Sequence, residues 1–210
     1  MASVRRPTRE RAFKAAIKEL DEPLFKSKGI HITAGGTGRE GDRVKIALRD
    51  KDNTTDIARL NIMIYMDVLE LDKGWTPAQY QRQGYGTIIR ALVCKVAKDL
   101  GYKKIQQISA AITKNNLEKS MKAMEARRKL KNAGPNNNIE NLKKAASWRP
   151  DSAYIMNKLG FQINNRANVN NQKMVVYTES RTLHLNTPTP KLNAVVRGIL
   201  NSSPLSRVNK

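Results

Sequence analysis

PAQYQRQGYGT, at residues 77–87, places two glycines directly before a strongly periodic apolar segment. The apolar positions of that segment are Ile88, Ile89, Leu92, Val93, Val96 and Leu100. Their spacing predicts a helix with one apolar face, on which Arg90 and Lys95 take the opposite side and after which Gly101 ends the helix. A glycine-rich turn that enters a helix presents backbone N–H groups and the positive end of the helix dipole. This stretch therefore suits an anion, most often a phosphate.

The composition is that of a basic protein with one core. The chain has 210 residues, with 39 Lys and Arg against 18 Asp and Glu, and a net charge of +21. Such a charge favours contact with nucleic acid, an anionic membrane surface or an acidic partner. The single cysteine, Cys94, allows no intrachain disulfide and suits a reducing compartment. No apolar run approaches the roughly 18 residues of a membrane span, so we expect an intracellular protein, cytoplasmic or nuclear, or one carried in a virion or nucleoprotein particle.

The charge is concentrated in two segments. Residues 114–149 contain 10 basic and 3 acidic residues, a net charge of +7. Residues 182–210 contain 4 basic residues and no acidic one, a net charge of +4. We interpret the first as a basic helical insert and the second as a basic extended tail. The insert is either a solvated helical hairpin or a surface for a polyphosphate such as nucleic acid.

Alternating patterns predict strands on both sides of the glycine turn. Residues 43–49 and 57–66 alternate as strands do, and residues 51–54 read as the hairpin turn between them. The alternation breaks after Asp67, where a bulge or a tight connection is expected. Residues 104–111 follow the helix as a further strand, parallel to the one before it. These elements predict an α/β protein with a mixed α+β sheet.

A second short helix and a last strand follow the insert. The pattern predicts the helix over residues 152–159, closed by Gly160-Phe161, and the strand over residues 174–178. Together with the glycine turn, they carry a resemblance. Gln81-Arg82-Gln83-Gly84-Tyr85-Gly86 and Lys158-Leu159-Gly160-Phe161 resemble two motifs of the GCN5-related N-acetyltransferase superfamily, the first of which reads Arg/Gln-x-x-Gly-x-Gly/Ala.

The resemblance implies an acyl-CoA N-acyltransferase-like (GNAT) fold over residues 1–181, with acetyl-CoA as co-substrate. The acceptor would be an amine on a protein, a polyamine or another small molecule. The cofactor-binding residues implied by the first motif are Gln81, Arg82, Gln83, Gly84, Tyr85, Gly86 and Thr87. The backbone N–H groups of this loop would hold the pyrophosphate, because glycines allow close approach and the helix dipole favours the anion.

The residues of the chemical step are less regular. Acetylation of an amine needs a base for its proton and often an acid for the leaving thiolate. Much of the superfamily has a tyrosine as this acid, but Met156 occupies that position here. Tyr154 is two residues earlier, about 200° round the helix, and is the remaining candidate acid. Glu70 is the candidate base, with Asp72 as its alternative, and the isolated His31 and His184 suggest no metal site.

A second hypothesis follows from Met156 and from the positive charge. The chain would be an acetyltransferase-like protein with a structural role and little or no activity. It would bind nucleic acid or a large nucleoprotein or virion assembly through residues 114–149 and 182–210. Such binding should weaken steeply as salt rises, because counterions are released from the nucleic acid.

Overall fold

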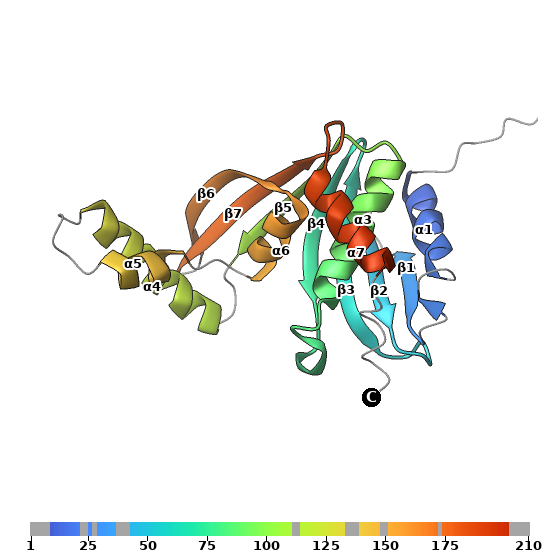
Figure 1. Ribbon diagram of the computed structural model, residues 1–210, viewed down its shortest axis with the longest axis horizontal. Coiled ribbons are helices and arrows are strands. Elements are labelled where there is room, and N and C mark those ends of the chain that lie inside the picture. Colours follow the sequence, from blue (N-terminus) through green and yellow to red (C-terminus); the bar gives the residue numbers. More distant parts are fainter. Residues whose placement is uncertain are drawn as a thin grey trace, which may run out of the picture. The chain divides into compact units, whose positions relative to one another are not determined.

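The computed structural model describes residues 9–21, 25–26, 29–36, 43–110, 114–132, 139–147, 151–171 and 174–201 (Figure 1). The chain divides into two compact units. The first consists of Met1–Gln107, Lys158–Phe161 and Thr182–Lys210, and the second of Ile108–Asn157 and Gln162–Arg181. The N-terminal helix α1 therefore belongs to the same unit as the C-terminal helix α7.

The first unit is built on a mixed sheet. Its strands are β1 (His31–Gly36), β2 (Arg43–Arg49), β3 (Asp56–Tyr65), β4 (Val68–Trp75), the start of β5 (Lys104–Ala110) and the end of β7 (Met174–His184). They follow the order β1-β2-β3-β4-β5-β7. The first four are antiparallel neighbours, whereas β4 and β5 are parallel. The predicted α/β class, the mixed sheet and the parallel strand after the helix are confirmed, although the sequence pattern had not predicted β1.

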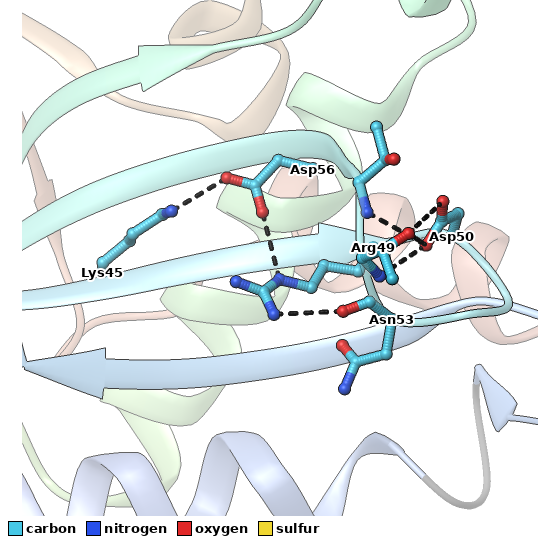
Figure 2. Close-up of polar contacts among 7 residues, drawn as sticks. Lys45, Arg49, Asp50, Asn53 and Asp56 are labelled. Carbon is cyan, nitrogen blue, oxygen red and sulfur yellow. Dashed lines mark hydrogen bonds and ion pairs between the residues drawn. The ribbon is translucent and has the colours of Figure 1, made fainter.

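The β2–β3 hairpin is fixed by polar contacts at its turn (Figure 2). An Asp50 carboxylate oxygen accepts the N–H groups of Thr54 and Thr55, at 2.8 and 3.1 Å. The hydrogen bond from the Thr55 N–H, followed by that from Thr54, lowers the pKa of Asp50. Asn53 has a positive φ of 56°, a conformation that asparagine tolerates better than most residues. The predicted hairpin turn is confirmed.

Two cations neutralise Asp56 at the start of β3 (Figure 2). Lys45 Nζ lies 2.9 Å from one carboxylate oxygen, and Arg49 Nε lies 3.1 Å from the other. Burial by itself would raise the pKa of Asp56, but the contacts with Lys45 and Arg49 outweigh it and the pKa is lowered. The three side chains belong to adjacent strands and so help to hold the β2–β3 register.

The break in alternation after Asp67 is caused by a tight turn, and a bulge follows further along the strand. Met66 and Asp67 form a tight turn between β3 and β4, in which Met66 has a φ of 42°. Further along, Leu60 pairs with Gly74 and Ile62 with Leu71, so β4 contains one residue more than β3 over that interval. This bulge lies at residues 72–73. The predicted tight connection is confirmed, and the bulge comes in addition to it.

Helices α1 (Arg9–Glu19) and α3 (Tyr85–Asp99) both pack on the sheet of the first unit. Phe13 and Ile17 of α1 are fully buried, as are most apolar positions of α3. The six apolar positions that the sequence pattern assigned to the core are buried except Leu100, which is exposed.

The prediction of an extended tail from residue 182 is wrong over the described residues. Strand β7 continues to His184, and α7 (Pro190–Asn201) lies beside α3 (Figure 1). Leu192, Val196 and Ile199 recur at helical spacing and are buried, so α7 forms because it covers an apolar surface. The expected domain boundary at 181/182 falls inside β7, and residues 202–210 lie outside the described part of the chain.

Lys103 connects the residue that follows β7 to the β3–β4 turn. Its N–H donates to the Asp67 carbonyl at 2.8 Å, and its own carbonyl accepts the Leu185 N–H at 2.8 Å. Its ammonium group also lies 2.7 Å from Asp67 Oδ2. Residues after β7 are thereby attached to the β3–β4 turn through one backbone position.

The second unit contains the basic insert. Its elements are α4 (Lys114–Lys131), α5 (Ile139–Ala146), most of α6 (Asp151–Leu159), β6 (Gln162–Asn171) and the first part of β7. Helices α4 and α5 pack together through small side chains, with Ala123 and Ala126 buried and Arg127 Nε donating to the Ala146 carbonyl at 2.9 Å. The predicted helices are confirmed, but β6 was missed because its asparagine-rich sequence lacks an apolar alternation.

Candidate active site

The loop before α3 is shaped by its own glutamine side chains. A short 3-10 helix, Ala78–Tyr80, precedes the loop. Gln81 Nε2 donates to the Thr76 carbonyl at 3.1 Å, and Gln83 Nε2 donates to the Gln79 carbonyl at 2.7 Å. Both side-chain amides are thus engaged within the loop itself. Of the predicted cofactor-binding residues, these two support the loop conformation through their side chains.

The start of α3 has the backbone geometry of an anion site. Gly84 is its N-cap, with a φ of 90°, and Arg82 two residues earlier has a φ of 61°. A Cβ added to Gly84 would meet no atom within 4 Å, so its backbone faces open space. Within this described stretch, no side chain caps the helix and the first turn has no acidic residue. The N–H groups of Tyr85 and Gly86 therefore have no acceptor within the helix, whereas that of Thr87 donates to the Gly84 carbonyl at 2.9 Å.

Tyr85 lies at this helix start but faces the core. Its side chain is 2% exposed, and its ring meets that of Tyr80 edge to face, with the centroids 6.2 Å apart. Burial, with a smaller effect of Tyr80, raises the pKa of Tyr85. Only the backbone N–H of Tyr85 can serve a ligand at the loop, while its ring anchors the loop to the core.

The pairing between the parallel strands β4 and β5 ends before β4 reaches this loop. The pairing of β4 with β5 runs from Val68 and Lys104 to Leu71 and Gln107. Strand β4 continues to Trp75, through the bulge at residues 72–73, and these residues have no pairing with β5 in the described structure. Gln107 is buried at the last paired position, and its side-chain oxygen has no described partner. Among the described residues, the main-chain groups of β4 beyond Leu71 therefore have no partner on β5.

Glu70 is half-buried on β4, immediately before the end of the pairing. In the strand register, Glu70 pairs with Met63 of β3 on one side and with Gln106 of β5 on the other. Burial, followed by the negative charge of Asp72, raises the pKa of Glu70. A carboxylate with a raised pKa is a stronger base than an ordinary glutamate. The two predicted carboxylates, Glu70 and Asp72, are thus close enough on β4 for the charge of Asp72 to affect the pKa of Glu70.

The two candidate positions on α6 have opposite environments. Met156 is fully buried, whereas Tyr154 is 53% exposed. This agrees with the expected rotation of two residues around the helix. Both belong to the second unit, whereas Glu70 and the loop belong to the first. The role of Tyr154 as an acid stays a prediction.

Arg90 is the residue at this site that the sequence pattern misplaced. We expected it on the polar face of α3, but its side chain is only 6% exposed. Its Nη1 donates to the Gly86 carbonyl at 2.9 Å. Its Nη2 lies 2.1 Å from the place that a Cβ of Gly74 would occupy. The missing side chain on β4 is what makes room for the guanidinium, and an amphipathic pattern along one helix cannot reveal it.

Among the described residues, no group of three or more His, Cys, Asp and Glu could hold a metal ion. In the same part of the chain, no helix combines the length and apolarity needed to cross a membrane.

No protein-family model matches the chain, and no curated protein sequence matches it.

The chain is similar to solved structures of acetyltransferases. The ribosomal-protein-S18-alanine N-acetyltransferase from Escherichia coli is 12% identical, with a TM-score of 0.47 over 88% of this chain and 93% of that chain. The spermidine/spermine N-acetyltransferase from Vibrio cholerae is 11% identical, with a TM-score of 0.45 over 73% and 69%. A Salmonella typhimurium protein described as an acetyltransferase, with its cofactor acetyl-CoA, is 9% identical, with a TM-score of 0.44 over 71% and 68%. At these values nothing about the activity of this chain follows from the similarity.

Proposed function

We propose that this protein is an N-acetyltransferase that transfers the acetyl group of acetyl-CoA to an amine. The observation that carries the proposal is the coincidence of three features in the first unit. They are an uncapped helix start behind Gly84, a bulged strand β4 that loses its parallel neighbour, and a half-buried Glu70 on that strand. The helix start can bind the anionic part of an acyl carrier, and the bulged strand leaves room for its acyl group. Glu70 can remove a proton from the amine.

The residues of the loop fit the diphosphate of acetyl-CoA. The N–H groups of Tyr85 and Gly86 are free of helical acceptors, and Gly84 leaves open space in front of them. The positive end of the α3 dipole favours two negative charges at this point. Acetyl-CoA when bound supplies the activated acyl group, and the loop orients it through the backbone rather than through side chains.

Glu70 would accept the proton of the acceptor amine, directly or through a water molecule. Burial and Asp72 raise its pKa, so the carboxylate holds a proton more strongly than an exposed glutamate does. Tyr154 is the proposed donor to the departing thiolate, because the thioether of Met156 has no proton to give. Replacement of Tyr154 by Phe should then slow turnover without weakening acetyl-CoA binding. An unchanged rate would remove Tyr154 from the mechanism.

The test is to incubate the purified protein with acetyl-CoA and a small panel of amines. Spermidine and a peptide with a free N-terminal alanine represent the acceptors of two of the similar enzymes, and a lysine-containing peptide adds a third amine. We expect one of these classes to gain an acetyl group, as detected by mass spectrometry. Absence of acetyl-CoA binding by titration calorimetry would contradict the proposal. Binding without transfer to any amine would favour the structural role.

The α4–α5 hairpin supports a second candidate function, attachment to a polyanion such as nucleic acid. Its small residues face inward, and its cations face solvent. The exposed cations in the described part of the hairpin are Lys119, Lys122, Arg128, Lys129, Lys131, Lys143 and Lys144. Clustered exposed cations bind phosphate backbones without sequence preference. This function is compatible with acetyl transfer, since none of the residues proposed for acetyl transfer lies on α4 or α5.

A further inference from the structure

Arg90 places a positive charge inside the first unit, close to the start of α3. Side chains in a helix lean toward its N-terminus, and Arg90 reaches back one turn to the Gly86 carbonyl. Its Nε has no hydrogen-bond partner among the described residues. None of the ion pairs formed by those residues includes Arg90 either. The residue as a whole is therefore more than nine-tenths buried, and its guanidinium makes a single hydrogen bond among the described residues.

Such an arrangement is costly in the free protein. A buried cation loses its hydration, and that loss is offset only by a counter-ion or by several hydrogen bonds. Burial lowers the pKa of Arg90 to about 10, which still leaves it charged at neutral pH. Cys94 is the titratable group whose charge affects the pKa of Arg90, and its thiol stays protonated because its own burial raises its pKa.

We propose that Arg90 is the internal counter-charge of an anion site at the N-terminus of α3, and that the diphosphate of acetyl-CoA completes its charge balance. The inference rests on the proposed function and names a residue that the function itself does not require. Two independent observations support this proposal. At the helix start, the N–H groups of Tyr85 and Gly86 have no acceptor within the helix, and the buried guanidinium points toward the same first turn.

Gly74 makes this position of the Arg90 guanidinium possible. The guanidinium occupies the space beside β4 where any other residue would carry a Cβ, with Nη2 at 2.1 Å and Cζ at 2.9 Å from that point. Arg90 thus links Gly86 in the loop to the bulged end of β4. It holds together the two elements that the proposed cofactor must contact, and we regard it as a positioning residue rather than a catalytic one.

The experiment compares Arg90→Met with wild type in stability and in acetyl-CoA affinity. If Arg90 is a counter-charge, its replacement by Met should have opposite effects on stability and on acetyl-CoA affinity. Without ligand, Arg90→Met should melt at or above the wild-type temperature, because a buried uncompensated charge has been replaced by an apolar side chain. Its dissociation constant for acetyl-CoA should rise about tenfold, since one nearby opposite charge changes an equilibrium by roughly that factor or more. A purely structural arginine would instead lose stability together with affinity.

Two matched variants and a neutral probe separate charge from shape. Arg90→Lys keeps the charge and should bind acetyl-CoA within about threefold of wild type, a value well inside the tenfold change expected for charge loss. Gly74→Ala displaces the guanidinium without removing it, so its acetyl-CoA affinity should lie between those of Arg90→Lys and Arg90→Met. Pantetheine, which has no phosphate groups, should bind Arg90→Met as well as it binds wild type.

The possible outcomes distinguish this inference from the proposed function. If wild type does not bind acetyl-CoA, the proposed function and the inference both fail. If wild type binds but Arg90→Met binds equally tightly, only the inference is overturned. An Arg90→Met protein that unfolds or melts well below wild type also overturns it, since Arg90 would then be a structural residue.

Discussion

Helices α3 and α4 both carry cations, yet they hold them in opposite ways. In α3, ten of the fifteen residues are buried, and Arg90 is one of them. In α4, Ala123 and Ala126 are the described residues that are buried, and Lys119, Lys122, Lys129 and Lys131 are exposed. A solvated charge is weakly coupled to its neighbours, whereas a buried one strongly affects everything that binds nearby. We therefore expect single substitutions around α3 to change ligand binding far more than single substitutions on α4.

The largest expected effect comes from Gly84→Asp at the start of α3. The new side chain would be strained at a φ of 90° and would place a negative charge where the diphosphate should bind. We expect acetyl-CoA binding to fall below detection in titration calorimetry. Gly35→Asp is the matched control, because Gly35 is exposed on β1, has no atom within 4 Å of an added Cβ and lies away from the loop. Normal binding by Gly84→Asp would rule out the loop as the diphosphate site.

A smaller but still large effect is expected from Glu70→Gln. Loss of a general base typically slows a reaction by about 10²–10⁴, so the turnover number should fall within that range. The affinity for acetyl-CoA should change less than about twofold, because Glu70 acts on the amine. Turnover by wild type should rise with pH through the pKa of Glu70, which lies above that of an ordinary glutamate, since the ionised form is the base. Equal turnover by Glu70→Gln would exclude this residue, and Asp72→Asn would then be the next variant to measure.

On α4–α5, replacement of several lysines is needed for a comparable effect. Lys119, Lys122 and Lys143 are exposed and form no ion pair among the described residues. Their joint replacement by Gln should reduce the slope of log affinity against log salt for duplex DNA by about 3, if each contacts one phosphate. Acetyl-CoA affinity should be unchanged. The matched control replaces Lys18, Lys51 and Lys191 of the first unit, and an equal loss in both proteins would show that net charge alone is responsible.

The smallest expected effect is that of Glu125→Gln on α4. The hydrogen bond and charge of Lys129, 2.8 Å away, lower the pKa of Glu125, but both side chains are exposed. Exposed pairs of this kind contribute little to stability. Thermal unfolding should therefore be unchanged within error. A clear fall in melting temperature would mean that this face of α4 is not simply solvated, and the contrast with α3 would be weaker than proposed.

The sequence predicted the parts of the first unit that repeat with a regular period. The α3 core, the β2–β3 hairpin and the parallel strand after α3 each follow from local patterns. Arg90 could not be placed in this way, because its burial depends on Gly74, a residue on another element. The β4 bulge lies at residues 72–73, beyond the break expected after Asp67, and its position could not be predicted because it is defined by pairing with β3.

Helix α7 was missed although its start carries a usable signal. Thr189 precedes Pro190, and proline is common at the first position of a helix. The Thr189 carbonyl accepts the Asn193 N–H at 3.0 Å, and its hydroxyl accepts a hydrogen bond from Lys98 Nζ at 2.8 Å. The many Asn, Ser and Pro residues around this helix obscured its apolar stripe, which becomes meaningful only against the surface of α3.

The attachment of Leu185 to Lys103 has a consequence for the biosynthesis of the protein. The first unit is discontinuous, and its last elements are translated after the whole of the second unit. Helix α7 covers part of α3, so the nascent chain must keep an apolar surface uncovered until Pro190–Asn201 have emerged. Chains that terminate early would expose this surface and be prone to aggregation or proteolysis. A ribosome that stalls before residue 190 would therefore release a first unit that cannot complete its core.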